Sequence, residues 1–213
     1  MTQQVVLATG NAKKLVELRR IVAEHPAVTS GEVDIAVLGL ADVDSYPEPA
    51  ETERTFEGNA LIKARVCVAE TGLPALADDS GLTVVELSGM PGVRSARWSG
   101  PQATDEENND LLLRQLDDVA DERRQASFIS AVALVFPDGR EFVRHGEVRG
   151  RLLTAPRGDN GFGYDPLFVP DGERRSYAEL DAAQKDASSH RGQAVRAIAE
   201  VLVEQLRTEG QAG

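Results

Sequence analysis

The hydrophobic pattern of the chain alternates between short apolar runs and longer segments whose apolar residues recur at helical spacing. The apolar runs, which predict buried strands, are residues 5–8, 33–40, 74–77, 82–87, 126–136 and 141–148. Helical spacing predicts helices that begin at Ala12, after Thr55, after Thr104 and near Ser189. The clearest strand pair is the hairpin that turns at residues 137–139, Pro-Asp-Gly.

Residues 74–81 bring two adjacent carboxylates, Asp78 and Asp79, to what the pattern predicts as the end of a strand. Because side chains alternate along a strand, the two point to opposite faces unless a turn at Ser80-Gly81 re-aims one of them. One aspartate can then hold a metal or polarise water while the other braces the loop. The alternative is an Asx-type turn that caps the strand, since Asp, Ser and Gly are common turn residues.

The segment between the first strand and the first helix, residues 9–14, has the composition of an anion site. It combines backbone N–H groups at a helix N-terminus with Lys13 and Lys14, which suits phosphate. The spacing of a Walker A loop is absent. A solvated lysine pair is the alternative, but lysine is electrostatically unfavourable at a helix N-terminus, which favours a functional role.

A glycine-rich loop, residues 157–170, carries Phe162, Tyr164 and Asp165 among its glycines. Glycine lets a backbone approach a flat ligand closely while an aromatic ring stacks on it. The alternative is a surface turn whose aromatic rings cover the core.

Composition limits the partners of this chain. Its 213 residues are 41% hydrophobic and 27% charged, as in a globular domain with a sizeable core. The net charge of −12 argues against binding DNA or RNA polymers, although a few converging lysines can still bind a small anion. Cys67 is the only cysteine, and we find neither a signal peptide nor an apolar window of transmembrane length. We therefore expect a cytoplasmic protein that does not contact membranes.

Cationic residues occur in several segments that can converge on the acidic strand end: Lys13, Lys14, Lys63, Lys185 and Arg191. Cations neutralise phosphate oxygens, carboxylates hold Mg²⁺, and a carboxylate orients or deprotonates the attacking water. Phe162 supplies a stacking platform for a base, whereas Lys63 has the alternative of extending along the surface to solvent. These residues predict nucleoside triphosphate hydrolysis without specifying which bond is cut.

Five co-linear motifs, which together cover nearly the whole chain, resemble those of the inosine triphosphatase family, the house-cleaning dITP/XTP pyrophosphatases of non-standard purine nucleotides. The motifs are Thr9-Gly10-Asn11-Ala12-Lys13-Lys14, Thr55-Phe56 with Asn59-Ala60 and Lys63-Ala64, Ala77-Asp78-Asp79-Ser80-Gly81, Gly161-Phe162-Gly163-Tyr164-Asp165-Pro166 and Ser189-His190-Arg191-Gly192.

This resemblance implies an elongated α/β fold with a long, twisted mixed sheet, flanking helices and two lobes around a central cleft. It implies that residues 1–207 form a single two-lobed catalytic domain, and we expect residues 208–213 to be a disordered tail. The implied reaction converts XTP, ITP or dITP and water to the monophosphate and pyrophosphate. The implied cofactor is Mg²⁺ and the implied assembly is a homodimer.

The resemblance also implies a role for each matching residue. Asp79 is the implied general base and a metal-side carboxylate, and Glu51 is the second metal candidate. The implied substrate contacts are Thr9, Gly10, Asn11, Ala12, Lys13 and Lys14 for the triphosphate, Lys63 for the phosphates, Ser80, then Phe162, Gly163, Tyr164 and Asp165 for the nucleoside, and Lys185, His190 and Arg191 for the base. A donor such as Arg191 aimed at O6 of hypoxanthine or xanthine would reject the 6-amino group of adenine.

Two positions depart from the family pattern. Gly58 stands where many relatives carry an acidic residue, and Glu53 stands where glycine is frequent. A helical step of about 100° argues against Glu57 replacing an acidic residue at position 58.

Three other functions remain open. They are a related enzyme for modified pyrimidine or other nucleotides, a nucleotide sensor that no longer hydrolyses, and a phosphate-transferring kinase. The intact Asp78-Asp79 pair argues against the sensor. The absence of a Walker-type loop and of a second-substrate site argues against the kinase.

Overall fold

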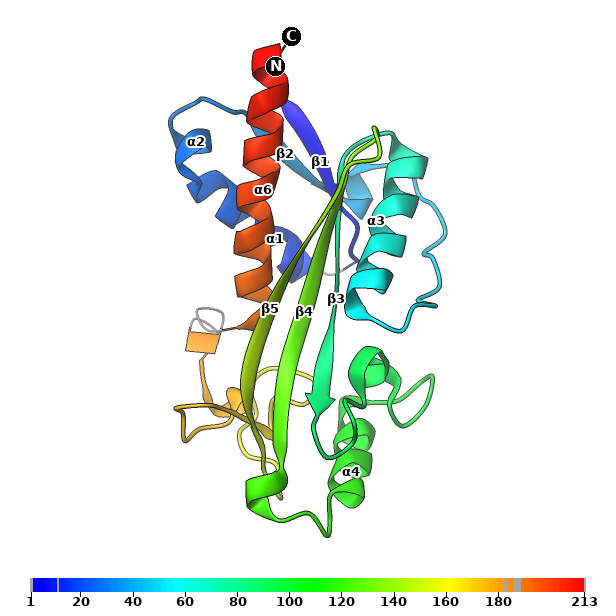
Figure 1. Ribbon diagram of the computed structural model, residues 1–213, viewed down its shortest axis with the longest axis vertical. Coiled ribbons are helices and arrows are strands. Elements are labelled where there is room, and N and C mark those ends of the chain that lie inside the picture. The colour runs from blue at the N-terminus through cyan, green and yellow to red at the C-terminus, as the bar shows by residue number, and fades with distance from the viewer. Residues whose placement is uncertain (1, 11, 182–183, 186–188, 213) are drawn as a thin grey trace. The chain divides into compact units, whose positions relative to one another are not determined.

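The computed structural model (Figure 1) describes residues 2–10, 12–181, 184–185 and 189–212. Its strands are β1 (Gln3–Leu7), β2 (Ile35–Gly39), β3 (Ala75–Val84), β4 (Gln125–Val135), β5 (Glu141–Leu152) and β6 (Phe168–Pro170). Its helices are α1 (Ala12–Glu24), α2 (Pro26–Thr29), α3 (Phe56–Thr71), α4 (Asp105–Gln115) and α6 (His190–Ala212), with 3₁₀ turns η1 (Leu40–Asp42), η2 (Gly92–Arg97), η3 (Asp121–Arg123) and η4 (Tyr177–Glu179). One sheet has the strand order β2-β1-β3-β4-β5-β6, so the prediction of a mixed α/β fold is confirmed.

The chain divides into two compact units. The first unit comprises residues 1–79, 131–145 and 194–213, and the second comprises residues 80–130 and 146–193. No helix within the described part of the chain combines the length and the apolar character that a membrane span requires.

In the first unit, β1 lies between β2 and β3 and is parallel to both, with Val5 opposite Val37 and Leu7 opposite Leu76. Helices α1 and α6 pack on one face of this sheet, where Leu76 is buried with them. Helix α3 packs on the other face, where Ala77 is buried against it. Figure 1 shows α6 and α3 on opposite sides of the strands.

Helix α3 has the boundaries that the sequence predicts. Thr55 Oγ1 accepts the N–H of Gly58 at 3.0 Å as the N-cap. Gly72 ends the helix with a left-handed φ of 69°, which glycine adopts without steric cost. Helix α6 extends to Ala212, whereas we expected a tail from residue 208.

Strand β3 corrects the prediction of a turn after the two aspartates. It continues without interruption through Asp78, Asp79, Ser80 and Gly81 to Val84. Gly81 is required by close packing, since a Cβ there would lie 2.4 Å from Ser95 Oγ and 2.6 Å from a backbone carbonyl oxygen. The Asx-turn alternative is therefore wrong, and the two aspartates keep the alternation of a strand.

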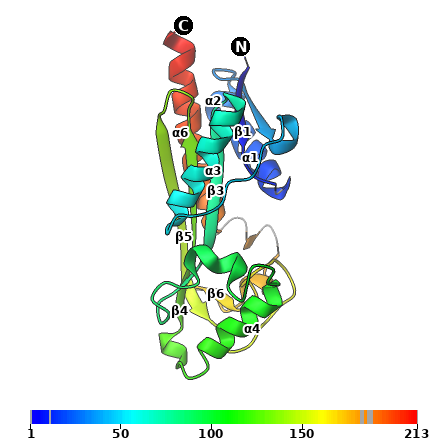
Figure 2. The ribbon, with the colours of Figure 1, turned by 90° about the vertical axis from the view of Figure 1, so that its right-hand side faces the viewer.

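In the second unit, α4 begins with a capping box in which Thr104 Oγ1 accepts from Glu107 N and Glu107 Oε2 accepts from Thr104 N. Strand β6 pairs antiparallel with β5, and Leu152 lies opposite Phe168. A buried cluster centred on Phe128 and Tyr177 forms the core of this unit. Figure 2 shows α4 with the neighbouring loops of the second unit.

Candidate active site

Asp78 and Asp79 are adjacent on β3 and have different partners. Asp78 accepts two hydrogen bonds from Lys14 Nζ, at 2.8 and 2.7 Å, in an ion pair between β3 and α1. This pairing lies on the face that carries Leu76, as alternation along a strand requires. The negative charge of Asp78 is thus matched by a lysine that the sequence had placed with the triphosphate.

Asp79 lies on the α3 face of the same strand and is 9% exposed. Its Oδ2 accepts a hydrogen bond of 2.9 Å from Asn59 Nδ2, and Asn59 is fully buried. Asn59 Oδ1 in turn accepts the backbone N–H of Glu53 at 3.0 Å. The Asn59 amide therefore links Oδ2 of Asp79 to the backbone of the segment that precedes α3.

The second metal candidate, Glu51, forms an ion pair with Lys63 in which Nζ and Oε1 are 3.1 Å apart. The Lys63 side chain is only 13% exposed, so it is not an extended surface lysine. Lys63 and Ala8 also border a cavity of about 130 Å³, whose other walls are Leu40, Asp44, Ser45, Tyr46, Glu48 and Pro49.

The segment predicted to bind the triphosphate begins directly after β1. Ala8 N donates to Leu76 O at 2.7 Å, and Thr9 N donates to Leu7 O at 2.9 Å, so the chain turns at once towards α1. Gly10 is exposed, and α1 begins at Ala12. Asn11 and the side chains of Ala12 and Lys13 lie outside the described residues, so Thr9, Gly10 and Lys14 are the members of this segment that are described in full.

In the second unit the glycine-rich loop presents Phe162, whose side chain is 58% exposed. Lys185 Nζ lies 4.6 Å from the centroid of its ring, and the Arg191 guanidinium carbon lies 5.8 Å from it. Both distances fall within the range of cation–π attraction. An exposed aromatic face with two cations beside it suits a flat, electron-rich ligand.

Asp165 fixes the same loop from inside. Its carboxylate accepts the N–H of Phe162 at 2.8 Å and pairs with the ammonium group of Lys185. Burial raises the pKa of Asp165 above its usual value, although the nearby Lys185 and Arg191 charges act in the opposite direction. Asp165 therefore positions both the ring and one of its cations.

Two other residues predicted to contact the nucleoside or base lie mostly inside the second unit. Tyr164 is 4% exposed, and its hydroxyl donates to Ser95 O at 2.9 Å. His190 stacks on Phe128 with ring centroids 5.0 Å apart and planes 8° from parallel. Their rings support the site from the core, whereas Phe162 lies at the surface. Ser80 continues β3 as the first residue of the second unit.

Three residues that the sequence analysis did not assign hold these groups in place. Asn59 holds Asp79. Asp105 and Asn109 of α4 hold Gly163. Asp105 Oδ2 accepts the Gly163 N–H at 2.6 Å, and Asn109 Nδ2 donates to the Gly163 carbonyl at 2.9 Å. A polar residue within the buried stripe of a predicted helix was the available signal for Asn59. The i, i+4 spacing was the corresponding signal for the α4 pair.

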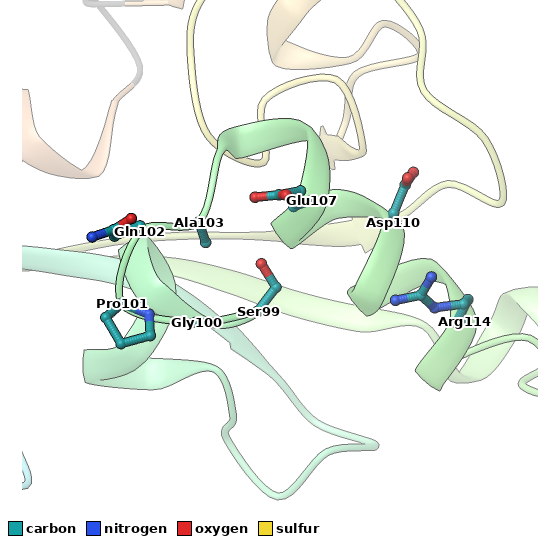
Figure 3. Close-up of a pocket in the computed structure, with 8 residues that line it drawn as sticks. All are labelled: Ser99, Gly100, Pro101, Gln102, Ala103, Glu107, Asp110 and Arg114. Atoms are coloured by element: carbon teal, nitrogen blue, oxygen red, sulfur yellow. The ribbon is translucent and has the colours of Figure 1, made fainter.

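Among the described residues, the predicted site residues fall into two groups. The acidic pair, Glu51, Lys14 and Lys63 belong to the first unit, and the glycine-rich loop with Lys185 and Arg191 belongs to the second. A cavity of about 590 Å³, larger than the one beside Lys63, is lined by none of them. Figure 3 shows that it lies between the 99–103 loop and Glu107, Asp110 and Arg114 of α4. Volume alone therefore does not locate the chemistry, and we assign no role to this cavity.

The donor chemistry of Glu51 and Asp79 fits Mg²⁺, a hard cation that is held by one or two carboxylates together with waters and substrate phosphates. Within the described part of the chain no group of three or more His, Cys, Asp or Glu side chains is arranged to hold a metal ion. A site completed by substrate oxygens requires fewer protein ligands than that.

The fold and these residues define a mixed α/β protein with a buried acidic pair beside lysines in one unit and an aromatic platform beside cations in the other. The family model described as the Ham1 family matches residues 5–201, and the chain belongs to this family. A dITP/XTP pyrophosphatase from Frankia alni is 59% identical over 208 residues, which are 95% of this chain and 98% of the relative. A dITP/XTP pyrophosphatase from Corynebacterium glutamicum is 53% identical over 205 residues, 94% of this chain and 97% of the relative.

A solved structure supports the same assignment. The HAM1 protein from Coxiella burnetii matches with a TM-score of 0.86 and 41% identity, covering 95% of this chain and 99% of that one. The family resemblance of the five sequence motifs is thereby confirmed.

Proposed function

We propose that this protein is a Mg²⁺-dependent nucleoside triphosphate pyrophosphohydrolase that converts XTP, ITP and dITP to the monophosphate and pyrophosphate. The observation that carries the proposal is the buried pair of adjacent carboxylates on β3 and the groups bonded to it from α1 and α3. Lys14 forms an ion pair with Asp78, and the Asn59 amide donates to Asp79 Oδ2. In this proposal Asp79 is the general base, as the family resemblance implies, and Asp78 holds Lys14 near it.

In this reaction Asp79 takes a proton from water as the water oxygen forms a bond to the α-phosphorus. The bond from that phosphorus to the bridging oxygen breaks, and pyrophosphate leaves with the electron pair. In the proposal Lys14 and Lys63 neutralise non-bridging phosphate oxygens. Mg²⁺ held by Glu51 and Asp79 would supply further charge neutralisation at the phosphates.

Base selection belongs to the second unit in this proposal. Phe162 stacks on the purine, and Arg191 and Lys185 beside its ring provide donors for O6 of hypoxanthine or xanthine. Adenine would place a donor against a donor, which leaves both groups without an acceptor. The 53–59% identity to proteins named dITP/XTP pyrophosphatase supports this substrate class.

The biological role that follows is removal of non-standard purine nucleotides before polymerases insert them into DNA or RNA. We place this role in the cytoplasm, where nucleotide pools are used, and the single cysteine fits a reducing compartment. We further propose a homodimer, which sedimentation equilibrium would distinguish from a monomer of 22.9 kDa.

The direct test is pyrophosphate release from ITP, XTP, dITP, GTP and ATP with Mg²⁺, with and without a chelator. Metal-dependent release confined to the first three nucleotides is the expected result. Equal rates with ATP would overturn the proposed selectivity. Tight binding of a nucleotide without any release of pyrophosphate would indicate a nucleotide sensor that does not hydrolyse.

A further inference from the structure

Asn59 connects Asp79 to the loop that precedes α3. Its side chain donates to Asp79 Oδ2 at 2.9 Å and accepts the Glu53 N–H at 3.0 Å, and none of its surface is exposed. Its backbone N–H is bonded to Thr55 O at 3.2 Å, within the first turn of the helix. One buried amide therefore links β3, α3 and the loop of residues 51–54, which we call the acidic loop.

The acidic loop is packed directly against Gly58. A Cβ at position 58 would lie 2.6 Å from Glu53 Cβ and 2.7 Å from Glu53 Cγ, whereas carbon atoms in contact are normally about 3.5–4.0 Å apart. The atoms in the way belong to the base of the Glu53 side chain, which cannot swing aside without moving the loop backbone. Glycine at position 58 is what allows Glu53 to occupy this space.

We propose that Asn59 is a positioning residue that orients Asp79 for proton abstraction, and that the Glu53–Gly58 contact fixes the loop to which Asn59 is bonded. The inference rests on the proposed role of Asp79 as the base. An amide donor on Oδ2 restricts the rotation of the Asp79 carboxylate, and so restricts the directions in which it can accept a proton. A merely structural Asn59 would affect folding and leave turnover by the folded protein unchanged.

The same contact involves both departures from the family pattern. Glu53 and Gly58 are the two positions at which the motifs depart from the resemblance given above, and these two residues touch. A side chain at position 58 would meet the base of the Glu53 side chain. The two departures therefore concern residues that are in contact with each other.

The first test compares Asn59→Asp with Asn108→Asp. Aspartate at position 59 keeps an acceptor for the Glu53 N–H and replaces the donor to Asp79 by a carboxylate oxygen. Asn108 is a matched control because it is 2% exposed and, among the described residues, its side chain bonds backbone groups, Ser99 N and Ala96 O. We expect Asn59→Asp to lower kcat for ITP about 10- to 100-fold with KM unchanged, and Asn108→Asp to lower the unfolding temperature without changing kcat. Equal effects on kcat would overturn the inference.

The second test needs no change at Asn59, so it stands if Asn59→Asp fails to fold. Gly58→Ala places a Cβ against Glu53, and we expect kcat to fall while the nucleotide is still bound. The double variant Glu53→Gly/Gly58→Ala removes the clashing atoms, and we expect it to recover most of the lost kcat. A double variant no better than Gly58→Ala would overturn the role of the contact.

These outcomes are separable from failure of the proposed function. If the unaltered protein releases no pyrophosphate from ITP, or if Asp79→Asn keeps a normal rate, the proposed function or its base is wrong. If the unaltered protein is active and Asp79→Asn is not, unchanged kcat in Asn59→Asp contradicts the positioning role alone.

Discussion

Arg124 is a buried arginine whose guanidinium group is bonded to backbone carbonyls. It is 2% exposed and donates to the carbonyl oxygens of Leu116, Val119, Leu152 and Leu153 at 2.7 to 3.4 Å. Leu116 caps the C-terminal end of α4, and Leu152 ends β5. The planar fork of arginine can satisfy several acceptors in one plane, which the single ammonium group of lysine cannot. This side chain therefore ties the end of a helix to the end of a strand.

We predict that Arg124→Met lowers the free energy of unfolding by about 3 kcal/mol or more, because several buried carbonyls lose a charged donor. Urea unfolding followed by the fluorescence of Trp98 measures the loss. Arg123→Met is the control: the Arg123 side chain is 64% exposed and paired with Glu86, so its removal should cost about 1 kcal/mol or less. Similar losses in the two variants would contradict a special role for the buried group.

Asp165 gives a prediction for pH dependence. Its pKa is raised by burial, so the carboxylate takes up a proton at a higher pH than an exposed aspartate does. As pH falls through this raised pKa, Lys185 loses its negative partner and the Phe162 N–H loses a charged acceptor. We expect the KM for ITP to rise in that range. The sign for folding is opposite: the folded state holds the proton more tightly, so this group alone makes the free energy of unfolding fall as pH rises between about 3.9 and the raised pKa.

The measurement is KM for ITP against pH in the unaltered protein and in Asp165→Asn. The variant should have a high KM at every pH, and its KM should not rise further at acidic pH through titration of this group. An identical acidic rise in both proteins would show that another group is responsible.

Helix α4 holds the glycine-rich loop, residues 157–170, through the backbone of Gly163. Asp105 and Asn109 project from the same side of the helix, four residues apart, and bond the N–H and the carbonyl of Gly163. Gly163 has a φ of 60°, a left-handed conformation that glycine adopts readily. The position of the Phe162 ring, which precedes Gly163, is thus set by a rigid helix.

We predict that Asp105→Ala and Asn109→Leu each raise the KM for ITP about threefold to tenfold while kcat changes little. The reason is that each removes one hydrogen bond, worth about 0.5–1.5 kcal/mol, from the loop that carries the stacking ring. Steady-state kinetics with ITP provides the measurement. Asp110→Asn, on the exposed part of the same helix, serves as the control and should leave KM unchanged. A fall in kcat at constant KM would contradict this account.

At the scale of elements, what could be predicted from the sequence is what local interactions determine. Thr55 and Gly72 define α3 because a cap is a bond between near neighbours in the chain. The end of β3 was predicted wrongly because Ser80 and Gly81 are also turn formers. Gly81 is present instead for its close approach to Ser95, a residue that local pattern does not bring near it. Long-range packing overrode a local signal.

At the scale of the whole molecule, the same division applies to the candidate site. The residue types and their motifs are visible in the sequence, but the pairing of Lys14 with Asp78 depends on β1 and β3 being neighbours, which the strand order determines. Nor does local pattern reveal that Asn59 faces Asp79. The motifs of a site can be identified from neighbouring residues in the sequence, whereas the contacts between motifs depend on the order of the strands in the sheet.

The two units cannot be separated by cutting the chain at a loop. The chain passes between them at residues 79–80 in β3, 130–131 in β4, 145–146 in β5 and 193–194 in α6. Each passage lies inside a hydrogen-bonded element, so the loss of one unit would fray elements that belong also to the other. We therefore predict that the two units unfold in one cooperative transition.

The chain provides one probe for each unit. Trp98, the only tryptophan, lies in the second unit with its indole N–H bonded to Gln115 at 2.8 Å, and Cys67, the only cysteine, is fully buried in the first. In a urea titration, loss of the native Trp98 fluorescence and exposure of Cys67 to a thiol reagent should share one midpoint, with Cys67→Ala as the blank for labelling. Labelling of Cys67 at a urea concentration where Trp98 is still native would mean that the first unit unfolds alone. The elements that pass from one unit to the other would then fail to couple their unfolding, and the prediction would be wrong.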